Sequence, residues 1–242
     1  FFIGDLLTYG THINDTLEKL ISFSLKNNVE FILGNHDEMY HQLIIRQESS
    51  YLEKLPEWIK LSVDLTLEKL DKKLFQSIKM NKFYILGQSL ICHANSLILD
   101  SSNKKKWIYI DSLESYKEEA ERLKSLNFKL AVYGHTHRRK IFFKKKHHKI
   151  LFNEKPNFET FTFDLNKSSN LIINAGSIGQ PRSLNDLDCA WLFIKEDQNN
   201  IFQIKYINFE YDINRYLNSI DKEYSSNLEY ANKIKSFFTK YN

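Results

Sequence analysis

The start of the chain alternates between strand-like and helix-like patterns, and this constrains the fold more than any other feature. Phe1 to Ile3 is apolar and ends in Gly4-Asp5, as a buried strand does at its carboxyl end. From His12 to Lys26 apolar residues recur at the helical period of about 3.6, which predicts an amphipathic helix. Val29 to Leu33 is a second short apolar strand. This order predicts a βαβ unit with parallel pairing and a right-handed crossover.

The rest of the chain is predicted to alternate helices and strands as far as about Tyr133, then to hold strands, and to end in helix. The expected helices cover about Glu38–Lys79, Ser112–Leu126 and Tyr211–Tyr241. The expected strands are Phe83–Leu86 and Ser89–Cys92, forming a hairpin, then Leu130–Tyr133, Lys140–Phe152, Phe158–Asp164, Leu171–Asn174, Ala190–Ile194 and Ile201–Ile207. We expect the last five to meander antiparallel. One α/β domain over residues 1–242 is predicted, with a helical insertion at about 38–80 and C-terminal helices at about 211–241.

Composition favours a globular protein without a membrane span. Hydrophobic residues make up 42% of the 242 residues and the net charge is +4. No run approaches the ~18 apolar residues of a membrane span, and no N-terminal segment resembles a signal peptide. Cys92 and Cys189 each lie in or beside a separate apolar run, which indicates buried thiols and not a disulfide framework or CxxC metal site. We therefore expect a cytoplasmic protein.

Basic residues gather in three short segments. These are Lys104–Lys106, Arg138–Lys140 and Lys144–Lys149. Aromatic residues flank the segments but do not alternate with the charges, as a base-stacking surface would prefer. A solvated loop is therefore favoured over a nucleic-acid surface. Nucleic-acid binding or cleavage stays a weaker alternative, and it would show strong salt dependence.

Polar side chains follow several of the predicted strands where each strand ends. Asp5, Asn35, His93 and the pair His135 and His137 all occupy such positions. Ligands in open α/β folds gather beyond the carboxyl ends of the strands, so these side chains are candidates for one site. Each motif alone has a structural alternative. Gly-Asp is common in turns, and Asn-His-Asp before a helix is typical of a helix start.

The GHTH motif at Gly134 to His137 is the more specific signal. Two histidines two residues apart lie on one side of an extended chain but on nearly opposite sides of a helix. The preceding apolar run favours extension. Because Arg138 and Arg139 follow at once, a charged strand end is the alternative for this motif by itself.

The order GD, GNHD, His, GHTH resembles the calcineurin-like metallophosphoesterase superfamily. The stretch NAGSIGQPR, from Asn174 to Arg182, is similar to the branch of small bacterial and archaeal phosphodiesterases and phosphatases. The resemblance implies a four-layer αββα sandwich with mixed sheets. It also implies a dinuclear centre of two divalent transition-metal ions, and mixed imidazole and oxygen ligands suit Mn, Fe, Zn, Co or Ni.

The resemblance also implies roles for the metal ligands. Asp5 would bridge both ions, Asn35, His93 and His135 would bind the second ion, and His137 would bind the first. A hydroxide that bridges the ions would attack phosphorus in line.

Two residues of the GNHD motif would act in catalysis and not as ligands. His36 would face the scissile phosphate and protonate the leaving oxygen, and Asp37 would orient its imidazole.

One element of the superfamily is absent from the sequence given. The Asp-x-His motif that supplies further ligands of the first ion does not precede Asp5, and neither does its strand. We expect both upstream of Phe1. Without them, the alternative is a non-catalytic interaction module with a degenerate first metal site. The expected partner is a small phosphorylated substrate or a phosphoprotein, and the sequence does not specify the oligomeric state.

Overall fold

A computed structural model describes most of the chain. The described residues are 1–100, 102–103, 106–145, 150–153, 160–164, 168–180, 182, 189–197, 201–209, 212–225 and 227–239. The chain divides into two compact units. Unit 1 comprises Phe1–Lys82 and Asp212–Lys240, and unit 2 comprises Phe83–Tyr211 with Tyr241–Asn242. The single-domain organisation stays a prediction.

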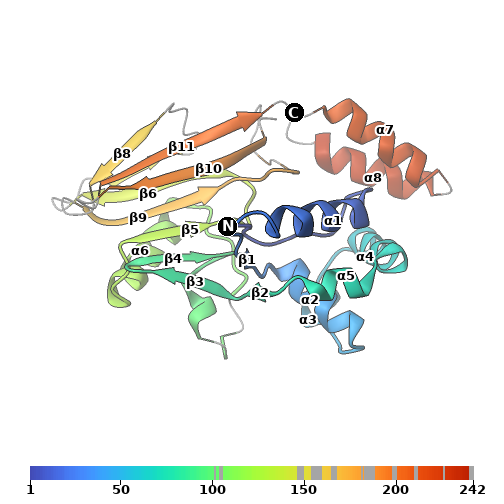
Figure 1. Cartoon of the computed structure of the whole chain (residues 1–242), viewed down its shortest axis with the longest axis horizontal. Helices are drawn as coiled ribbons and strands as arrows, with labels where there is room; N and C mark the ends of the chain where they lie inside the picture. The colour runs from blue at the N-terminus through green and yellow to red at the C-terminus, as the bar shows by residue number, and fades with distance from the viewer. Residues whose placement is uncertain are drawn as a thin grey trace. The chain divides into compact units, whose positions relative to one another are not determined.

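Unit 1 is mainly helical (Figure 1). Its elements are α1 (Ile13–Ser24), β1 (Phe31–Ile32), α2 (Asn35–Ile44), α3 (Ser50–Glu53), α4 (Glu57–Lys69), α5 (Lys72–Ser77), β2 (Met80–Asn81), α7 (Ile213–Glu223) and α8 (Leu228–Thr239). The predicted helical region after Glu38 is thus four helices, and Pro56 is the residue before α4 because its fixed φ suits a helix start. The predicted C-terminal helix is two helices.

The N-terminal strand of unit 1 is shorter than predicted but pairs as expected. Phe2 forms a single parallel bridge with Phe31. Its N–H donates to the Glu30 carbonyl at 2.9 Å, and its carbonyl accepts from the Ile32 N–H at 2.8 Å. Strand β1 also pairs in parallel with β2, a strand that the sequence pattern did not predict. With α1 between Phe2 and β1, parallel pairing of the βαβ unit is confirmed.

Two apolar clusters stabilise unit 1. One joins α1, β1, α2 and the helices after it, and includes Leu17, Met39, Val63 and Phe75. The other joins α4, α7 and α8 to the loop that follows Asp5 and includes Tyr9, Ile59, Ile220, Tyr224, Tyr230 and Ile234. The C-terminal helices therefore pack on a loop formed about two hundred residues earlier.

Unit 2 contains a six-stranded mixed sheet in the order β3-β4-β5-β9-β6-β7. The strands are β3 (Phe83–Leu86), β4 (Ser89–Cys92), β5 (Leu130–Tyr133), β6 (Arg139–Lys145), β7 (Ile150–Asn153) and β9 (Ser168–Ala175). The predicted hairpin is confirmed: β3 and β4 are antiparallel, and Gly87 in their turn has φ +55°. A left-handed φ of this kind favours glycine.

The prediction that the later strands meander was wrong for β9. This strand lies between β5 and β6 and is parallel to β5 and antiparallel to β6. Leu171, Ile172 and Ile173 are all 0% exposed. A strand with three consecutive buried residues needs cover on both faces, so it takes a central position and not an edge.

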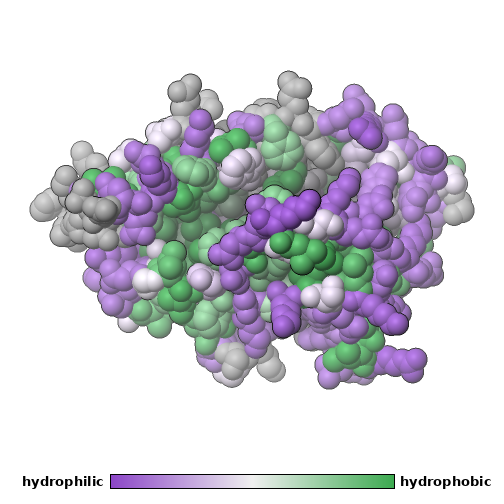
Figure 2. Space-filling model, viewed as in Figure 1, coloured by the Kyte–Doolittle hydropathy of each residue, from purple (hydrophilic) through white to green (hydrophobic). Residues whose placement is uncertain are grey.

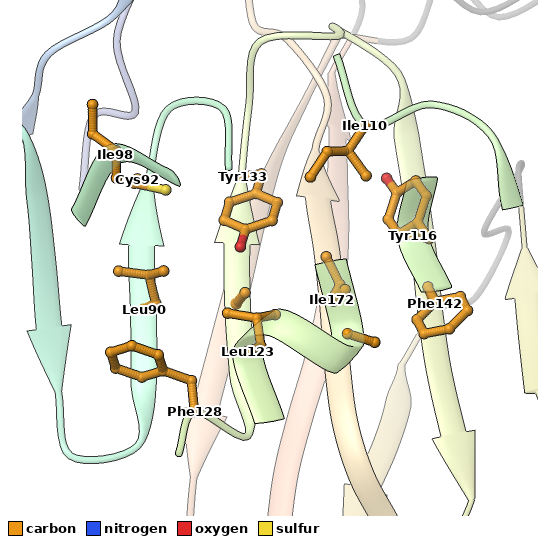
Figure 3. Packing of buried hydrophobic residues seen from close by; sticks show 12 residues of the cluster. Leu90, Cys92, Ile98, Ile110, Tyr116, Leu123, Phe128, Tyr133, Phe142 and Ile172 are labelled. Carbon is orange, nitrogen blue, oxygen red and sulfur yellow. The ribbon is translucent and has the colours of Figure 1, made fainter. Parts of the chain in front are cut away.

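The remaining elements of unit 2 complete its core. Strands β8 (Phe161–Asp164), β10 (Cys189–Glu196) and β11 (Ile201–Phe209) form an antiparallel sheet in the order β10-β11-β8. Helix α6 (Leu113–Ser125) and the short 3-10 helix η1 (Ser96–Leu99) pack on the larger sheet. Figure 3 shows side chains of α6 and of the large sheet in one cluster, among them Leu90, Leu123, Tyr133, Phe142 and Ile172.

The surface is mixed in polarity. In Figure 2 hydrophilic side chains cover much of the visible face, with apolar groups between them. Among the described residues, none of the helices has the length and apolar content needed to cross a bilayer.

Candidate metal and phosphoester site

The predicted site residues of unit 1 meet where the N-terminal bridge and β1 end. Asp5 follows the Phe2 bridge with φ +60°, and its Oδ1 accepts a hydrogen bond of 3.0 Å from the His36 N–H. His36 is in the first turn of α2. The positive end of a helix attracts a nearby carboxylate, so the start of α2 helps to hold the Asp5 side chain in place.

Gly34 allows this close approach. A Cβ at Gly34 would lie 2.2 Å from Asp5 Oδ1 and 2.5 Å from Asp5 N. Neither distance is possible for a real side chain, and the second involves backbone that cannot rotate away. The glycine of GNHD is therefore required for packing against Asp5, not for an unusual φ.

Asn35 and His36 begin α2 and are both buried, at 1% and 7% exposure. The Nδ1 of His36 lies 2.9 Å from Thr8 Oγ1. Its ring makes edge contacts with Tyr9 and Tyr51, at centroid distances of 6.0 and 5.5 Å. The His36 imidazole is therefore held by a hydroxyl and by the rings of two tyrosines.

The side chain of Asp37 is bonded to the backbone, and its predicted role of orienting the His36 imidazole stays a prediction. Its carboxylate accepts hydrogen bonds from the backbone N–H groups of Asp5 (2.7 Å), Leu6 (2.9 Å) and Gly34 (2.9 Å). Burial, and to a lesser degree the nearby Asp5 carboxylate, raise the pKa of Asp37 to about 6. Asp37 therefore fixes the backbone that carries Asp5, and the Thr8 hydroxyl lies within hydrogen-bonding distance of the His36 ring.

The predicted site residues of unit 2 meet because β4 and β5 are parallel neighbours. Their carboxyl ends lie at one edge of the sheet, where the Gly134 N–H donates to the His93 carbonyl at 2.9 Å. The side chains meet as well, with His93 Nε2 3.1 Å from His135 Nδ1. Two nitrogens bound to one ion at about 2.0–2.1 Å lie roughly 2.9–3.4 Å apart, so this pair fits a shared metal ion.

Backbone carbonyls orient two of the three histidines. His135 Nε2 lies 2.9 Å from the Trp107 carbonyl, and His137 Nδ1 lies 2.8 Å from the Gln180 carbonyl. A carbonyl can only accept, so each of these nitrogens carries a proton. The other nitrogen of each ring then presents its lone pair, which is the arrangement common in metal-ligating histidines.

The GHTH segment is not extended, contrary to the sequence argument. Strand β5 ends at Tyr133, and His135 and His137 both have φ +60°. The Thr136 N–H donates to the Gly134 carbonyl at 2.7 Å, which closes a tight turn. The chain must turn here because β6 is antiparallel to β9 and β5 is parallel to it.

Three supporting residues were missed by the sequence argument. Asn174, in the NAGSIGQPR stretch, donates through Nδ2 to the Gly134 carbonyl and accepts at Oδ1 from the Gly176 N–H at 3.1 Å. Glu119 of α6 is fully buried and accepts from the Tyr133 hydroxyl. Thr8 contacts His36. Only Asn174 belonged to a motif, and the other two had no sequence signal.

The predicted residues therefore form two sets, one in each unit. Asp5, Asn35, His36 and Asp37 lie around the start of α2. His93, His135 and His137 lie beyond the ends of β4 and β5. In the basic segments, residues 104–105 and 146–149 lie outside the described part of the chain, as does the side chain of Cys189. Cys92 is a buried free thiol, as predicted.

Comparison with known proteins identifies a family and a similar fold. The model of the calcineurin-like phosphoesterase family matches residues 1–139, more than half of the chain. A solved metallophosphoesterase structure from Sphaerobacter thermophilus is similar, with a TM-score of 0.64 and 18% sequence identity, covering 96% of this chain and 85% of that one. That likeness confirms the α/β sandwich fold. No curated protein matches the chain. The chain belongs to the calcineurin-like phosphoesterase family, whose members use divalent metal ions.

Proposed function

We propose that the protein hydrolyses phosphate esters, either phosphodiesters or phosphomonoesters, with two divalent metal ions. The observation that carries the proposal is the His93–His135 pair. Two imidazole nitrogens 3.1 Å apart have the spacing of two ligands on one ion. The other nitrogen of the His135 ring bonds to the Trp107 carbonyl, which fixes the orientation of the ring. The family match supports the reaction class.

The proposed ligands are those predicted from the sequence. Asp5 would bind both ions, Asn35, His93 and His135 would bind the second, and His137 would bind the first. Imidazole nitrogen with carboxylate and amide oxygen suits Mn, Fe, Zn, Co or Ni. When bound, the two ions supply an activated water as the nucleophile and neutralise charge on the phosphoryl oxygens.

The protein's own groups would place and protonate the substrate. The start of α2 holds Asp5 and, beside it, Asn35 and His36. His36 would give a proton to the leaving oxygen as the P–O bond breaks. Asp37 would act indirectly, because its three backbone hydrogen bonds hold Asp5 in place. The expected substrate is a small phosphorylated molecule or a phosphoprotein in the cytoplasm.

Alanine substitutions test the ligand set. Asp5→Ala, His93→Ala and His135→Ala are each expected to abolish Mn-dependent hydrolysis of an aryl phosphate, since each removes a proposed metal ligand. The protein should be expressed with any residues that its gene encodes before Phe1, and its rate measured across a metal series. His12→Ala is the matched control, because the His12 side chain is 72% exposed.

Two outcomes would contradict the proposal. Full activity in any of the three ligand variants would remove that residue from the ligand set. Metal binding by the wild-type protein without hydrolysis of any phosphomonoester or phosphodiester in a broad panel would indicate the non-catalytic interaction module instead.

A further inference from the structure

The loop after Asp5 brings a hydroxyl to the ring of His36. Thr8 Oγ1 lies 2.9 Å from His36 Nδ1 and 3.0 Å from the Tyr40 hydroxyl. Tyr40 is one turn along α2 from His36 and is fully buried. The three side chains form a continuous hydrogen-bonded series in the order His36, Thr8, Tyr40.

This placement of Thr8 requires a strained backbone. Thr8 and Tyr9 have φ of +84° and +66° in succession. A β-branched residue in the left-handed region is a real outlier and costs on the order of 1–3 kcal/mol, so the surrounding structure must hold it there.

Two helices supply that restraint. The Tyr9 N–H donates to Ser62 Oγ of α4 at 3.4 Å, and the Tyr9 carbonyl accepts from the Tyr216 hydroxyl of α7 at 2.6 Å. Thr11 Oγ1 lies 2.9 Å from Ser219 Oγ, also in α7. Helices distant in sequence thus fix the loop in the conformation that points the Thr8 hydroxyl at His36.

We propose that Thr8 is a positioning residue that accepts a hydrogen bond from the protonated Nδ1 of His36 and makes Nε2 the nitrogen that exchanges a proton with substrate. This inference rests on the proposed function. Thr8 donates its own hydroxyl proton to the Tyr40 oxygen, which fixes the direction of the series. During hydrolysis His36 reacts as an imidazolium with a proton on each ring nitrogen: the Nε2 proton goes to the leaving oxygen as the P–O bond breaks, and the neutral ring that results keeps its Nδ1 proton between His36 and Thr8.

The proposal predicts a leaving-group effect in Thr8→Val, which keeps the shape of threonine and removes the hydroxyl. A 2,4-dinitrophenolate leaves without a proton, whereas phenolate needs one. The kcat/KM for phenyl phosphate should therefore fall by about tenfold more than that for 2,4-dinitrophenyl phosphate, because a general acid contributes about 10²–10⁴-fold. The ratio of the two substrates is independent of the fraction of enzyme that is folded.

Three further variants separate positioning from a structural role. Thr8→Ser keeps the hydroxyl and should restore the wild-type ratio, and Tyr40→Phe should shift the ratio in the same direction as Thr8→Val. Thr16→Val removes an exposed hydroxyl of α1 that donates to the His12 carbonyl and takes no part in holding Thr8, and should leave the ratio unchanged. An equal loss on both substrates in Thr8→Val would overturn the proposal.

A second measurement does not depend on activity. In the metal-free protein, the ¹⁵N shifts of the neutral His36 ring, assigned by comparison with His36→Gln, should show the proton on Nδ1, and Thr8→Val should move it toward Nε2. A wild-type ring with its proton on Nε2 would overturn the proposal even if the protein hydrolysed nothing. A wild-type protein that is inactive on both substrates but protonated on Nδ1 would instead refute the proposed function alone.

Discussion

At the scale of single residues, the candidate site is marked by unusual backbone conformations. Seven non-glycine residues in the described part of the chain have positive φ. Five of them lie in the GD loop or the GHTH turn: Asp5, Thr8, Tyr9, His135 and His137. Strained residues persist only where their surroundings hold them, and they cluster at functional sites. Their concentration in these two segments supports a functional role for each of them.

Gly34→Ala tests the packing between the GNHD and GD motifs. The added Cβ would meet the Asp5 backbone N at 2.5 Å, so the GD loop must move. We expect a loss of about 1–3 kcal/mol in the free energy of unfolding, measured by urea titration, because overpacking of this kind has that cost. Mn affinity, measured by calorimetry, should fall as well.

Gly10→Ala is the control for this substitution. A Cβ at Gly10 would meet nothing within 4 Å, so stability and Mn affinity should both stay close to wild type. Wild-type Mn affinity in Gly34→Ala would show that Asp5 is not held in a metal site by this contact.

At the scale of elements, helix α6 ties together the two segments that carry His93 and His135. Glu119 accepts from the Tyr133 hydroxyl, at the end of β5, and from the Ser96 N–H at 2.8 Å, in η1 after His93. It also pairs with Arg122 one turn along α6. One buried carboxylate therefore joins α6, the end of β5 and the η1 segment that follows His93.

Glu119→Gln should weaken this junction. Glutamine offers only one acceptor oxygen. Its NH2 group would face one of the donors that now bond to the Glu119 carboxylate, and that hydrogen bond would be lost. We expect the free energy of unfolding to fall by about 1–3 kcal/mol, the cost of leaving a buried group unpaired. Glu118→Gln, at an exposed neighbouring position, should have little effect in the same denaturant titration. Equal stability of the two variants would show that Glu119 does not hold the junction.

At the scale of the whole molecule, the proposed ligands come from segments spread over more than half of the chain. A metal ion that binds only the folded protein raises the free energy of unfolding, by about 2.7 kcal/mol at a hundredfold excess over Kd. Mn should therefore raise the thermal unfolding midpoint and a chelator should reverse the shift.

Asp5→Ala and His135→Ala should reduce that thermal shift, since each removes a proposed ligand. His12→Ala should show the wild-type shift. An unchanged midpoint on adding Mn to the wild-type protein would argue against a bound ion in the folded state.

The local elements and the chemistry of the donors follow from the order of the residues alone. Helices α1 and α6, the β3–β4 hairpin and strand β5 follow from apolar periodicity and turn residues, because neighbouring residues decide these patterns. The motifs GD, GNHD and GHTH also named the candidate ligands before any coordinates. Hydrophobic pattern and residue type are local properties, so they can be read along the chain.

How those donors are held depends on contacts that form only in the folded protein. Strand β9 lies between β5 and β6 because buried residues need cover on both faces, and no local pattern specifies such neighbours. Asp37 bonds to backbone amides, and Thr8 bonds to His36, because a strained loop meets the start of α2. Contacts between residues distant in the chain depend on packing, so the supports of the site could not be predicted from its motifs.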